Sequence, residues 1–441
     1  MEFQKICVLG LGYIGLPTAS TFATHGLKVV GVDVNPDVVR ILRNGDLHIH
    51  EPGLHTLVQT ALSSGNFIIR EKPEPADAFI IAVPTPFFDD RRADMSYVTS
   101  AAEAISLCLR PGNLVVLEST SPPRTTRDLL APILERSGLK AGIDFYLAYS
   151  PERVLPGQIL RELIENARVI GGFDLASAQT SRDLYSIFVR GEIILTDATT
   201  AEMVKLMENT YRDVNIAIAN EFARLAERFD VDVWEAISIA NRHPRVKILR
   251  PGLGVGGHCI GVDPWFLVET APDLTYLIRA ARQVNDSQPE CVVNLARRAL
   301  GMSGLLSGDS LAGVRITALG LAYKPDVDDL RESPAIEVVH LLSQAGAMVR
   351  AYEPYKIDAQ IRGVITAPTL ESALSEAQLI LLLVAHRTFC QLQPEHVAAL
   401  TSARLLVDAV NTLPEKPWMS AGFTLFRLGA SAEGKRQLDI R

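Results

Sequence analysis

The stretch VLGLGYIGL, residues 8–16, decides the fold of the first part of the chain. Its glycines, Gly10, Gly12 and Gly15, have the spacing G-x-G-x-x-G. In such a turn the first glycine allows the tight bend, the second lets a pyrophosphate approach the backbone, and the third lets helix and strand pack closely. Asp33 ends the next apolar run, where a carboxylate bonds the ribose hydroxyls of NAD and repels the 2′-phosphate of NADP. The pattern predicts a NAD-binding Rossmann domain, and a purely structural glycine turn is the alternative.

Strands and helices alternate outward from this turn. We expect strands at Lys5–Gly10, Lys28–Asp33, Ala78–Val83, Leu114–Glu118 and Phe145–Tyr149, and a helix at Gly15–His25 closed by Gly26. Continuous apolar strands separated by helices are typical of a parallel sheet covered on both faces. Apolar residues spaced by three or four then predict one long helix over Thr200–Phe229, followed by helices at Val233–Ala240 and Leu274–Val284.

Strand–helix alternation returns after the Gly/Ser-rich stretch Gly301–Gly313. Strands are expected at Val314–Leu319, Met348–Tyr352, Leu379–Val384 and Leu405–Val410. Ser333 and Pro334 begin a helix as N-cap and first residue, and Gly346 closes it. The predicted fold is therefore α/β, with two Rossmann-like, doubly wound parallel-sheet domains at residues 1–195 and 311–441, joined by a helical middle, 196–300, with one long central helix. The two α/β ends could be distant copies of one plan.

Composition excludes several functional classes. The 441 residues include 43 Lys and Arg against 51 Asp and Glu, a net charge of −8, which argues against a nucleic-acid binder. There is no apolar run long enough for a membrane span, and the N-terminal apolar run is too short for a signal peptide. The five cysteines are scattered without a C-x-x-C pair, so we expect neither disulfides nor a metal site, and a cytoplasmic location.

One cysteine lies in an unusual context. Cys259 belongs to GLGVGGHCIGVD, residues 252–263, in which five of the first ten residues are glycine. Such a loop makes a poor core and a good backbone wall around a ligand. His258 and Asp263 flank the thiol. We interpret Cys259 as a nucleophile, with a buried packing cysteine as the alternative.

Polar residues gather at four further places. Lys205, Asn209 and Arg212 form a polar stripe on the long helix, away from its apolar face. Glu152 and Arg153 follow a strand directly, where α/β proteins bind ligands, and suit a general base and an anion clamp. The other two places are the basic cluster Asn241-Arg242-His243-Pro244-Arg245 and the pair Lys324 and Arg331 near a strand end. Each can bind a phosphate or carboxylate, and a solvated surface is the alternative in each case.

Six motifs together resemble one enzyme family over essentially the whole chain. They are Gly10–Gly15, Glu118-Ser119-Thr120, Ser150-Pro151-Glu152-Arg153, Ala201-Glu202 with Lys205 and Asn209, Gly256–Asp263, and Lys324 with Arg331-Glu332-Ser333. In this order they resemble the UDP-glucose/GDP-mannose dehydrogenase family. Three segments, SPERVLPG (150–157), NRHPR (241–245) and GGHCIGVDPWF (256–266), look most like the bacterial branch that acts on UDP-N-acetyl-D-mannosamine.

The resemblance implies roles for individual residues. Cys259 would form a thiohemiacetal and then a thioester with the sugar's C6, while Lys205, with Asn209 beside it, would exchange protons and stabilise an oxyanion. Glu152 would assist hydrolysis, and Asp263 would hold a water. NAD would bind Gly10, Gly12, Tyr13, Ile14, Gly15, Asp33, Thr85, Thr120 and Arg331. The UDP-sugar would bind Arg153, Val154, Lys205, Asn209, Arg212, His243, Arg245, Gly256, Tyr323 and Lys324. The long helix would form the core of a homodimer or higher homo-oligomer.

The resemblance also implies where the site lies and what it oxidises. Cys259 would face the nicotinamide between the outer domains. Glucose-specific members usually carry Phe and Lys between the cysteine and the aspartate, whereas this chain has Ile260-Gly261-Val262. UDP-N-acetyl-D-mannosamine is therefore the expected substrate, with the N-acetylglucosamine and N-acetylgalactosamine nucleotides as alternatives. A two-electron hydroxyacid-type dehydrogenase and an NAD-bound scaffold protein are the rival classes. The first needs no nucleophilic thiol, so Cys259 counts against it, and the complete set of titratable groups counts against the second.

Overall fold

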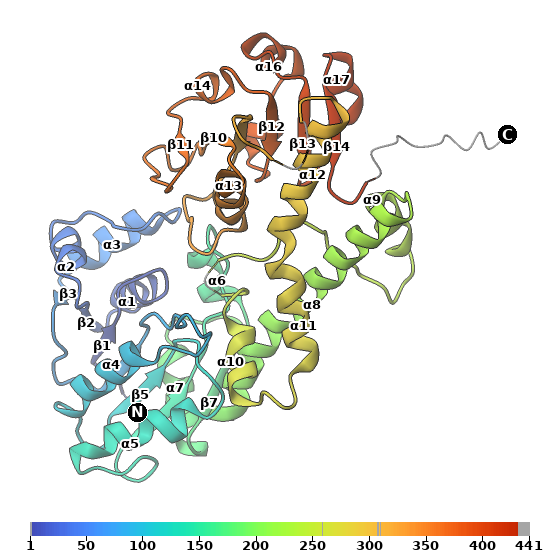
Figure 1. Ribbon diagram of the computed structural model, residues 1–441. Coiled ribbons are helices and arrows are strands. Elements are labelled where there is room, and N and C mark those ends of the chain that lie inside the picture. The colour runs from blue at the N-terminus through green and yellow to red at the C-terminus, as the bar shows by residue number, and fades with distance from the viewer. Residues whose placement is uncertain (1, 258, 307, 309, 431–441) are drawn as a thin grey trace. The chain divides into compact units, whose positions relative to one another are not determined.

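The computed structural model describes residues 2–257, 259–306, 308 and 310–430 (Figure 1). The chain folds into two compact units that are interleaved in sequence. The first unit contains Met1–Glu208 and Trp265–Leu274, and the second contains Asn209–Pro264 and Thr275–Arg441. No helix among the described residues combines the length and the apolar character that crossing a membrane requires.

The first unit is built on an eight-stranded sheet, counted over its described residues, with strand order β3-β2-β1-β4-β5-β6-β7-β8. The strands are β1 (Lys5–Leu9), β2 (Lys28–Val32), β3 (Phe67–Arg70), β4 (Ala78–Ile81), β5 (Leu114–Leu117), β6 (Tyr146–Tyr149), β7 (Arg168–Gly172) and β8 (Ile193–Asp197). The helices are α1 (Gly15–Thr24), α2 (Pro36–Arg43), α3 (Leu54–Ser63), α4 (Ser96–Ser106), η1 (Thr125–Leu130), α5 (Ala131–Leu134), η2 (Glu135–Ser137), α6 (Ile159–Glu165), α7 (Leu175–Tyr185) and most of α10 (Asp263–Thr270). β4 consists of Ala, Phe and Ile, and β5 consists of Leu and Val. Both strands are buried along their whole length, so helices must cover both faces.

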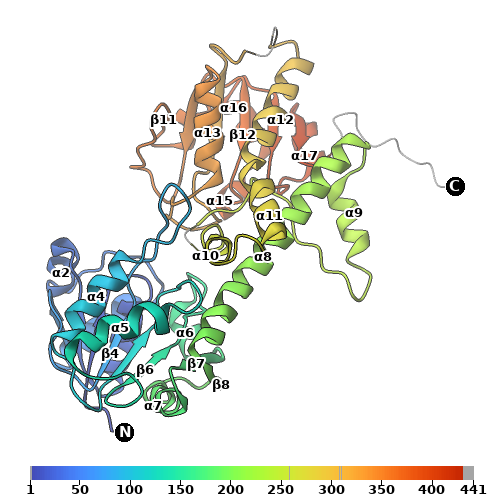
Figure 2. The ribbon, with the colours of Figure 1, turned by 60° about the horizontal axis from the view of Figure 1, so that its bottom comes forward.

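The second unit contains a six-stranded sheet in its described part, with strand order β11-β10-β9-β12-β13-β14. Its strands are β9 (Arg315–Leu319), β10 (Met348–Tyr352), β11 (Ile365–Thr366), β12 (Leu379–Leu382), β13 (Leu405–Asp408) and β14 (Thr424–Arg427), and their pairings are parallel. Helices α11 (Tyr276–Asp286) and α12 (Gln288–Met302) precede the sheet. Helices α13 (Pro334–Gln344), α14 (Leu370–Leu374), α15 (Arg387–Cys390), α16 (Pro394–Leu400) and α17 (Glu415–Ser420) connect its strands (Figure 2). Ser333 caps α13 by accepting a hydrogen bond from Ala335 N–H, as its sequence predicts.

The expected α/β fold with two Rossmann-like sheets is confirmed, with one difference in strand direction. β7 pairs antiparallel with β6, whereas the other strand pairings in the described part of the first sheet are parallel. The two sheets also share their order in space, because β9, β10 and β12 correspond to β1, β2 and β4. The suggestion that the two ends follow one plan therefore holds at the level of topology.

The long helix α8 (Ala198–Arg228, 31 residues) begins in the first unit and ends in the second. It is the long green helix of Figures 1 and 2, and α9 (Val233–Ala240) folds back beside its C-terminal end. The apolar stripe on it is exposed rather than packed: Met207, Tyr211, Ile218, Phe222 and Leu225. Small and polar residues form the buried face of α8 instead. Two of the polar residues, Asp213 and Asn220, make contacts with α11. Asp213 pairs with Arg282 at 2.6 Å, and Asn220 Nδ2 donates to Asn285 Oδ1 at 2.9 Å.

Candidate active site

The glycine turn after β1 has the geometry that its sequence predicts. Gly10 has φ +90°, and a Cβ placed there would lie 2.5 Å from the Ala82 carbonyl oxygen. A Cβ at Gly15 would overlap the Gly10 carbonyl, so the start of α1 and the turn can pack this closely only without side chains. A Cβ at Gly12 would meet no described atom within 4 Å. The turn is therefore tight on the protein side and open above Gly12, as a bound pyrophosphate requires.

Asp33 is connected directly to this turn. Its Oδ2 accepts a hydrogen bond from Leu11 N–H at 2.9 Å, and its Oδ1 accepts one from Asn35 N–H at 2.9 Å. The carboxylate is half-buried. Thr85 and Thr120 follow β4 and β5, at the same carboxyl edge of the sheet, next to the point where the strand order reverses between β1 and β4. These residues, with Tyr13 and Ile14 in the turn itself, fit a dinucleotide in the first unit.

The Ser150–Arg153 loop makes contacts with the N-terminal part of α8. Lys205 Nζ donates to the Glu152 carbonyl oxygen at 2.9 Å. Arg153 forms an ion pair with Glu208 at 2.6 Å and bonds the Ala167 carbonyl, so its guanidinium is tied to α8 and to the start of β7. Val154 packs against the first core. The structure therefore brings together Lys205, Glu152 and Arg153, which the sequence analysis selected from two separate motifs.

A buried charged cluster lies behind this loop, and the sequence analysis assigned no role to Arg168, Tyr185 or Glu118. Arg168, at the start of β7, pairs with Glu152, reaches Glu118 at 3.3 Å, and lies over the Tyr185 ring at 4.1 Å. Tyr185 donates its hydroxyl to Glu118 Oε1 at 2.6 Å, while Glu118 Oε2 has no hydrogen-bond partner among the described residues. Burial raises the pKa of Glu118 to about 7, although Arg168 opposes the shift. The sequence feature that could have indicated this cluster is Arg168, a single arginine at the start of an otherwise apolar strand.

In the second unit, the Cys259 loop is anchored at its C-terminal end by Asp263. Asp263 begins α10 and is 2% exposed, and its N–H donates to the Cys259 carbonyl at 2.8 Å. Asn209 Nδ2 donates to Asp263 Oδ2 at 2.5 Å. Cys259 itself is exposed. The structure thus joins Cys259, Asp263 and Asn209, while the predicted flanking residue His258 lies outside the described residues.

Tyr323 packs on the glycines of the same loop. A Cβ at Gly257, which has φ +78°, would lie 2.8 Å from Tyr323 Cε2, and one at Gly256 would lie 3.1 Å from Tyr323 Cβ. The Lys324 ammonium lies 5.6 Å from the centre of the Tyr323 ring. The glycines are therefore needed for close approach of an aromatic ring to the backbone beside Cys259.

The other predicted site residues of the second unit lie elsewhere in it. Arg331 forms an ion pair with Asp329 at 2.7 Å. Arg212 is exposed on α8, and His243 and Arg245 are exposed in the turn after α9. The Asn241 side chain closes that turn through bonds to Ile248 at 2.7 and 2.9 Å. The placement of Cys259 against the nicotinamide, and of Arg331 on NAD, stays a prediction.

No group of three or more His, Cys, Asp or Glu side chains in the described part of the chain is arranged to hold a metal ion. No disulfide joins Cys7, Cys108, Cys259, Cys291 and Cys390, all of which the structure describes. The candidate site residues supply a thiol, an ammonium, carboxylates and a dinucleotide turn.

Comparison with known proteins agrees with these features. The chain matches three models of one family: the NAD binding domain over residues 4–189, the central domain over 199–287 and the UDP binding domain over 317–415. A UDP-N-acetyl-D-mannosamine dehydrogenase of Methanococcus maripaludis is 45% identical over 98% of this chain and 98% of the relative. An NDP-N-acetyl-D-galactosaminuronic acid dehydrogenase of Ralstonia solanacearum is 46% identical over 92% of this chain and 96% of the relative.

A solved structure extends the likeness to the fold. The UDP-D-ManNAc dehydrogenase of Pyrococcus horikoshii superimposes with a TM-score of 0.90 at 41% identity, covering 97% of this chain and 100% of that chain. The glycine turn, the Cys259 loop and the two sheets thus occur together in a chain that matches the family in all three of its domains. The protein belongs to the UDP-glucose/GDP-mannose dehydrogenase family.

Proposed function

We propose that the protein oxidises the C6 alcohol of UDP-N-acetyl-D-mannosamine to the carboxylate, giving UDP-N-acetyl-D-mannosaminuronate. The observation that carries this proposal is the exposed thiol of Cys259 on a loop anchored by Asp263 and Asn209, in a chain with a dinucleotide turn. The relatives from Methanococcus maripaludis and Pyrococcus horikoshii support the choice of sugar.

The reaction balances as two oxidations and one hydrolysis. NAD, when bound, accepts one hydride from C6 in each oxidation. One water is consumed and three protons are released as the alcohol becomes a carboxylate. Gly10, Gly12, Tyr13, Ile14 and Gly15 would hold the pyrophosphate side of NAD, and Asp33 would hold a ribose, with Thr85, Thr120 and Arg331 as further contacts.

Cys259 makes and breaks the covalent bond to the sugar. Its thiolate attacks the C6 aldehyde, a C–S bond forms, and the carbonyl electron pair moves to oxygen. Loss of the second hydride leaves a thioester. Water then attacks the thioester carbon, the C–S bond breaks, and Cys259 regains its thiol. This sequence explains why a chain with a dinucleotide turn also carries a cysteine in a glycine-rich loop.

Lys205 and the residues around it act on charge and protons. The Lys205 ammonium stabilises the oxyanion that develops at C6, and Asn209, one turn on along α8, acts beside it. Glu152 assists the hydrolysis, and Asp263 holds the attacking water while it anchors the Cys259 loop. Arg153, Val154, Arg212, His243, Arg245, Gly256, Tyr323 and Lys324 bind the nucleotide sugar, whose pyrophosphate requires positive charge.

The number of NADH molecules formed per sugar tests the chemistry. Purified protein is mixed with limiting UDP-N-acetyl-D-mannosamine and excess NAD, and the absorbance of NADH is followed to completion. Two NADH per sugar supports the proposal. One NADH would support a two-electron hydroxyacid-type enzyme, and none would support an NAD-bound scaffold.

A substrate panel tests the sugar. The relative from Ralstonia solanacearum, named for a galactosaminuronic acid, supports the N-acetylgalactosamine nucleotide as the second candidate. kcat/KM is therefore compared for the N-acetylmannosamine, N-acetylglucosamine and N-acetylgalactosamine nucleotides of uridine. A higher value for either epimer would overturn the assigned substrate and leave the double oxidation intact.

We further propose that the protein works as a homodimer in the cytoplasm. The exposed apolar stripe of α8 supports a second copy as its partner, because large apolar side chains along one helix face favour burial. Cysteines that form no disulfide fit a reducing compartment. In this proposal, residues 1–195 bind NAD, 196–300 form the helical dimerisation region, and 311–441 bind the UDP-sugar.

A further inference from the structure

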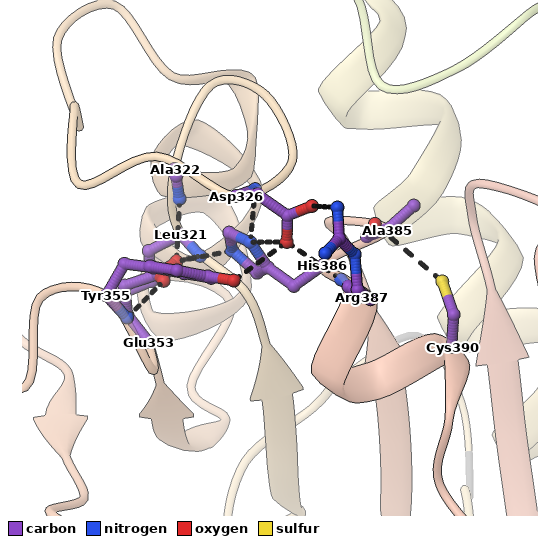
Figure 3. A network of polar contacts seen from close by, with 9 residues as sticks. All are labelled: Leu321, Ala322, Asp326, Glu353, Tyr355, Ala385, His386, Arg387 and Cys390. Atoms are coloured by element: carbon purple, nitrogen blue, oxygen red, sulfur yellow. Dashed lines mark hydrogen bonds and ion pairs between the residues drawn. The ribbon is translucent and has the colours of Figure 1, made fainter. Parts of the chain in front are cut away.

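The segment Leu321–Asp326, which follows β9, is held at its N-terminal end by one buried carboxylate (Figure 3). Glu353, directly after β10, accepts hydrogen bonds at Oε2 from Leu321 N–H at 2.7 Å and from Ala322 N–H at 2.9 Å. The Glu353 side chain is almost completely buried. Its orientation is fixed by a further hydrogen bond from Tyr355 N–H to Oε1 at 3.1 Å.

The same carboxylate is covered by His386, which is 0% exposed and lies just after β12. His386 Nδ1 accepts a hydrogen bond from Asp326 N–H at 2.9 Å. Because a backbone N–H can only donate, Nδ1 carries no proton, and the ring proton is on Nε2. Nε2 therefore donates to Glu353 Oε2, at 3.0 Å. The surroundings select one neutral tautomer of His386.

Asp326 closes the C-terminal end of the segment. It adopts φ +59°, a left-handed conformation that L-residues adopt rarely. Its Oδ1 accepts hydrogen bonds from the Tyr355 hydroxyl and from Arg387 N–H, both at 2.9 Å. Burial alone would raise the pKa of Asp326, but these bonds lower it, so the carboxylate stays ionised and can accept both. The two ends of Leu321–Asp326 are thus tied to the same imidazole ring, one through Glu353 and one directly.

Tyr323 and Lys324 lie between these two anchors. Tyr323 packs on Gly256 and, through its ring, on Gly257, which lie three and two residues before Cys259. A shift of the segment would therefore move a proposed ligand of the nucleotide and the ring that supports the Cys259 loop. Both ring nitrogens of His386 are occupied by hydrogen bonds within the protein, so neither is available to a ligand.

We propose that His386 is a positioning residue, which holds Leu321–Asp326 in the conformation that binds the uridine diphosphate part of the substrate. The proposal rests on the proposed function only in assigning Tyr323 and Lys324 to the nucleotide. It adds a residue that touches neither NAD nor sugar and acts through the loop.

Two substitutions separate the two bonds of His386. His386→Asn places an amide oxygen near the position of Nδ1, so it keeps an acceptor for Asp326 N–H and loses the bond to Glu353. His386→Gln places an amide nitrogen near the position of Nε2, so it keeps the donor to Glu353 and leaves Asp326 N–H without its acceptor. Binding of uridine diphosphate and of NAD is measured by calorimetry on each full-length variant, with steady-state KM and kcat for the sugar nucleotide.

We expect His386→Gln to weaken binding of uridine diphosphate by about tenfold, the effect of one lost hydrogen bond in a buried setting. His386→Asn should restore at least part of this affinity, the KM for the sugar nucleotide should rise more than kcat falls, and the affinity for NAD should stay unchanged. Unchanged affinity for uridine diphosphate in His386→Gln, or an equal loss of NAD affinity, would overturn the proposal.

A milder variant covers the case in which the buried substitutions do not fold. Tyr355→Phe removes only the hydroxyl that bonds Asp326, from a side chain that is exposed. This variant should bind uridine diphosphate severalfold more weakly, with its affinity for NAD unchanged. An affinity for uridine diphosphate equal to that of the wild type would contradict the role of the segment. The calorimetric measurements use uridine diphosphate rather than turnover, so a wrong choice of sugar would leave their outcome unaffected.

Discussion

Asp33 and Glu353 are counterparts in the two sheets. Each follows the second strand of its sheet directly, and each accepts a hydrogen bond from the residue after a positive-φ glycine, Leu11 in one case and Leu321 in the other. They differ in access: Asp33 is half-buried at the edge of an open turn, whereas Glu353 is 3% exposed beneath His386. The same topology thus leaves a carboxylate available to a ribose in the first sheet and occupies it internally in the second.

The role of Asp33 can be tested by removing its carboxylate. Asp33→Ala should weaken the free energy of NAD binding by roughly 1–3 kcal/mol, because a charge-assisted hydrogen bond to a ribose is lost. Calorimetry with NAD measures the change. Asp37→Ala is the matched control, since Asp37 forms an exposed ion pair with Arg40 and should have little effect. Equal affinities of Asp33→Ala and wild type would place the ribose elsewhere.

Cys259→Ser should bind NAD and the sugar nucleotide but fail to complete turnover, because the hydroxyl is a much weaker nucleophile than a thiolate. Quenched-flow counting of NADH, together with mass spectrometry of the protein, would detect a stalled or slowly hydrolysed ester. Cys390→Ser is the control, since Cys390 is the other exposed cysteine of the second sheet's unit. Full turnover in Cys259→Ser would refute the thioester route.

Lys205→Ala should lower kcat by a factor of about 100 or more while changing substrate binding much less. The ammonium is needed most when negative charge develops at C6, so its removal acts on the transition state. Single-turnover and steady-state kinetics separate the two effects. Lys416→Ala, at an exposed position on α17, controls for the loss of one positive charge. A rise in KM with kcat unchanged would make Lys205 a binding residue only.

The buried Glu118 predicts a pH dependence of stability. Its pKa is raised by burial from 4.5 to about 7, so folding favours the protonated form. This contribution to stability is complete below pH 4.5 and is lost as pH rises through about 7. Between these two values the slope reaches on the order of 1 kcal/mol per pH unit, and above about 7 it vanishes because the carboxyl is ionised in both states. Denaturant unfolding between pH 5 and pH 8 should therefore give a smaller fall in stability for Glu118→Gln than for wild type.

Glu202 contributes in the same direction, because burial also raises its pKa to about 7 against hydrogen bonds from Thr126 and Arg124. Glu118→Gln should consequently reduce the pH dependence rather than abolish it. Identical pH profiles for the variant and wild type would mean that Glu118 is ionised throughout.

The exposed stripe of α8 predicts the oligomeric state. Replacing Tyr211 and Phe222 by Glu should convert a dimer into monomers, because the charges would be buried against a second copy. Light scattering after size-exclusion chromatography measures the mass. Leu107→Glu is the control, since Leu107 is 89% exposed at the end of α4 and outside the stripe. A wild-type protein that is monomeric at micromolar concentration would contradict the proposed dimer.

Much of the fold could be predicted because most of its strands are short, largely apolar segments separated by helical patterns. β2, β9 and β10 begin and end within one residue of their expected positions, and α9 agrees at both ends. β7 and β8 were missed. β7 opens with Arg168, whose charge is stabilised only by Glu152 and Glu118 from other parts of the chain, and β8 is largely half-exposed. Such strands depend on tertiary contacts that a local pattern does not contain.

The same distinction applies to the candidate site. The glycine turn and the Cys259 loop are local patterns with a direct chemical meaning, and the sequence was sufficient to select them. Arg168, Tyr185 and His386 were not selected, because a single charged or aromatic residue beside an apolar strand has many meanings. The exposure of the α8 stripe was also beyond reach, since periodicity identifies a helix face but not what covers it.

The interleaving of the two units has a consequence for folding during synthesis on the ribosome. The chain leaves the first unit at Glu208 and returns to it for Trp265–Leu274. In that returning segment, Glu269 accepts a hydrogen bond from Ala93 N–H at 2.8 Å, and Trp265 lies 5.7 Å from the Arg91 guanidinium. A ribosome must therefore synthesise Asn209–Pro264, which belong to the second unit, before the first can be completed. Although domains generally fold from the N-terminus as they emerge, the nascent N-terminal unit here has to wait for part of its successor.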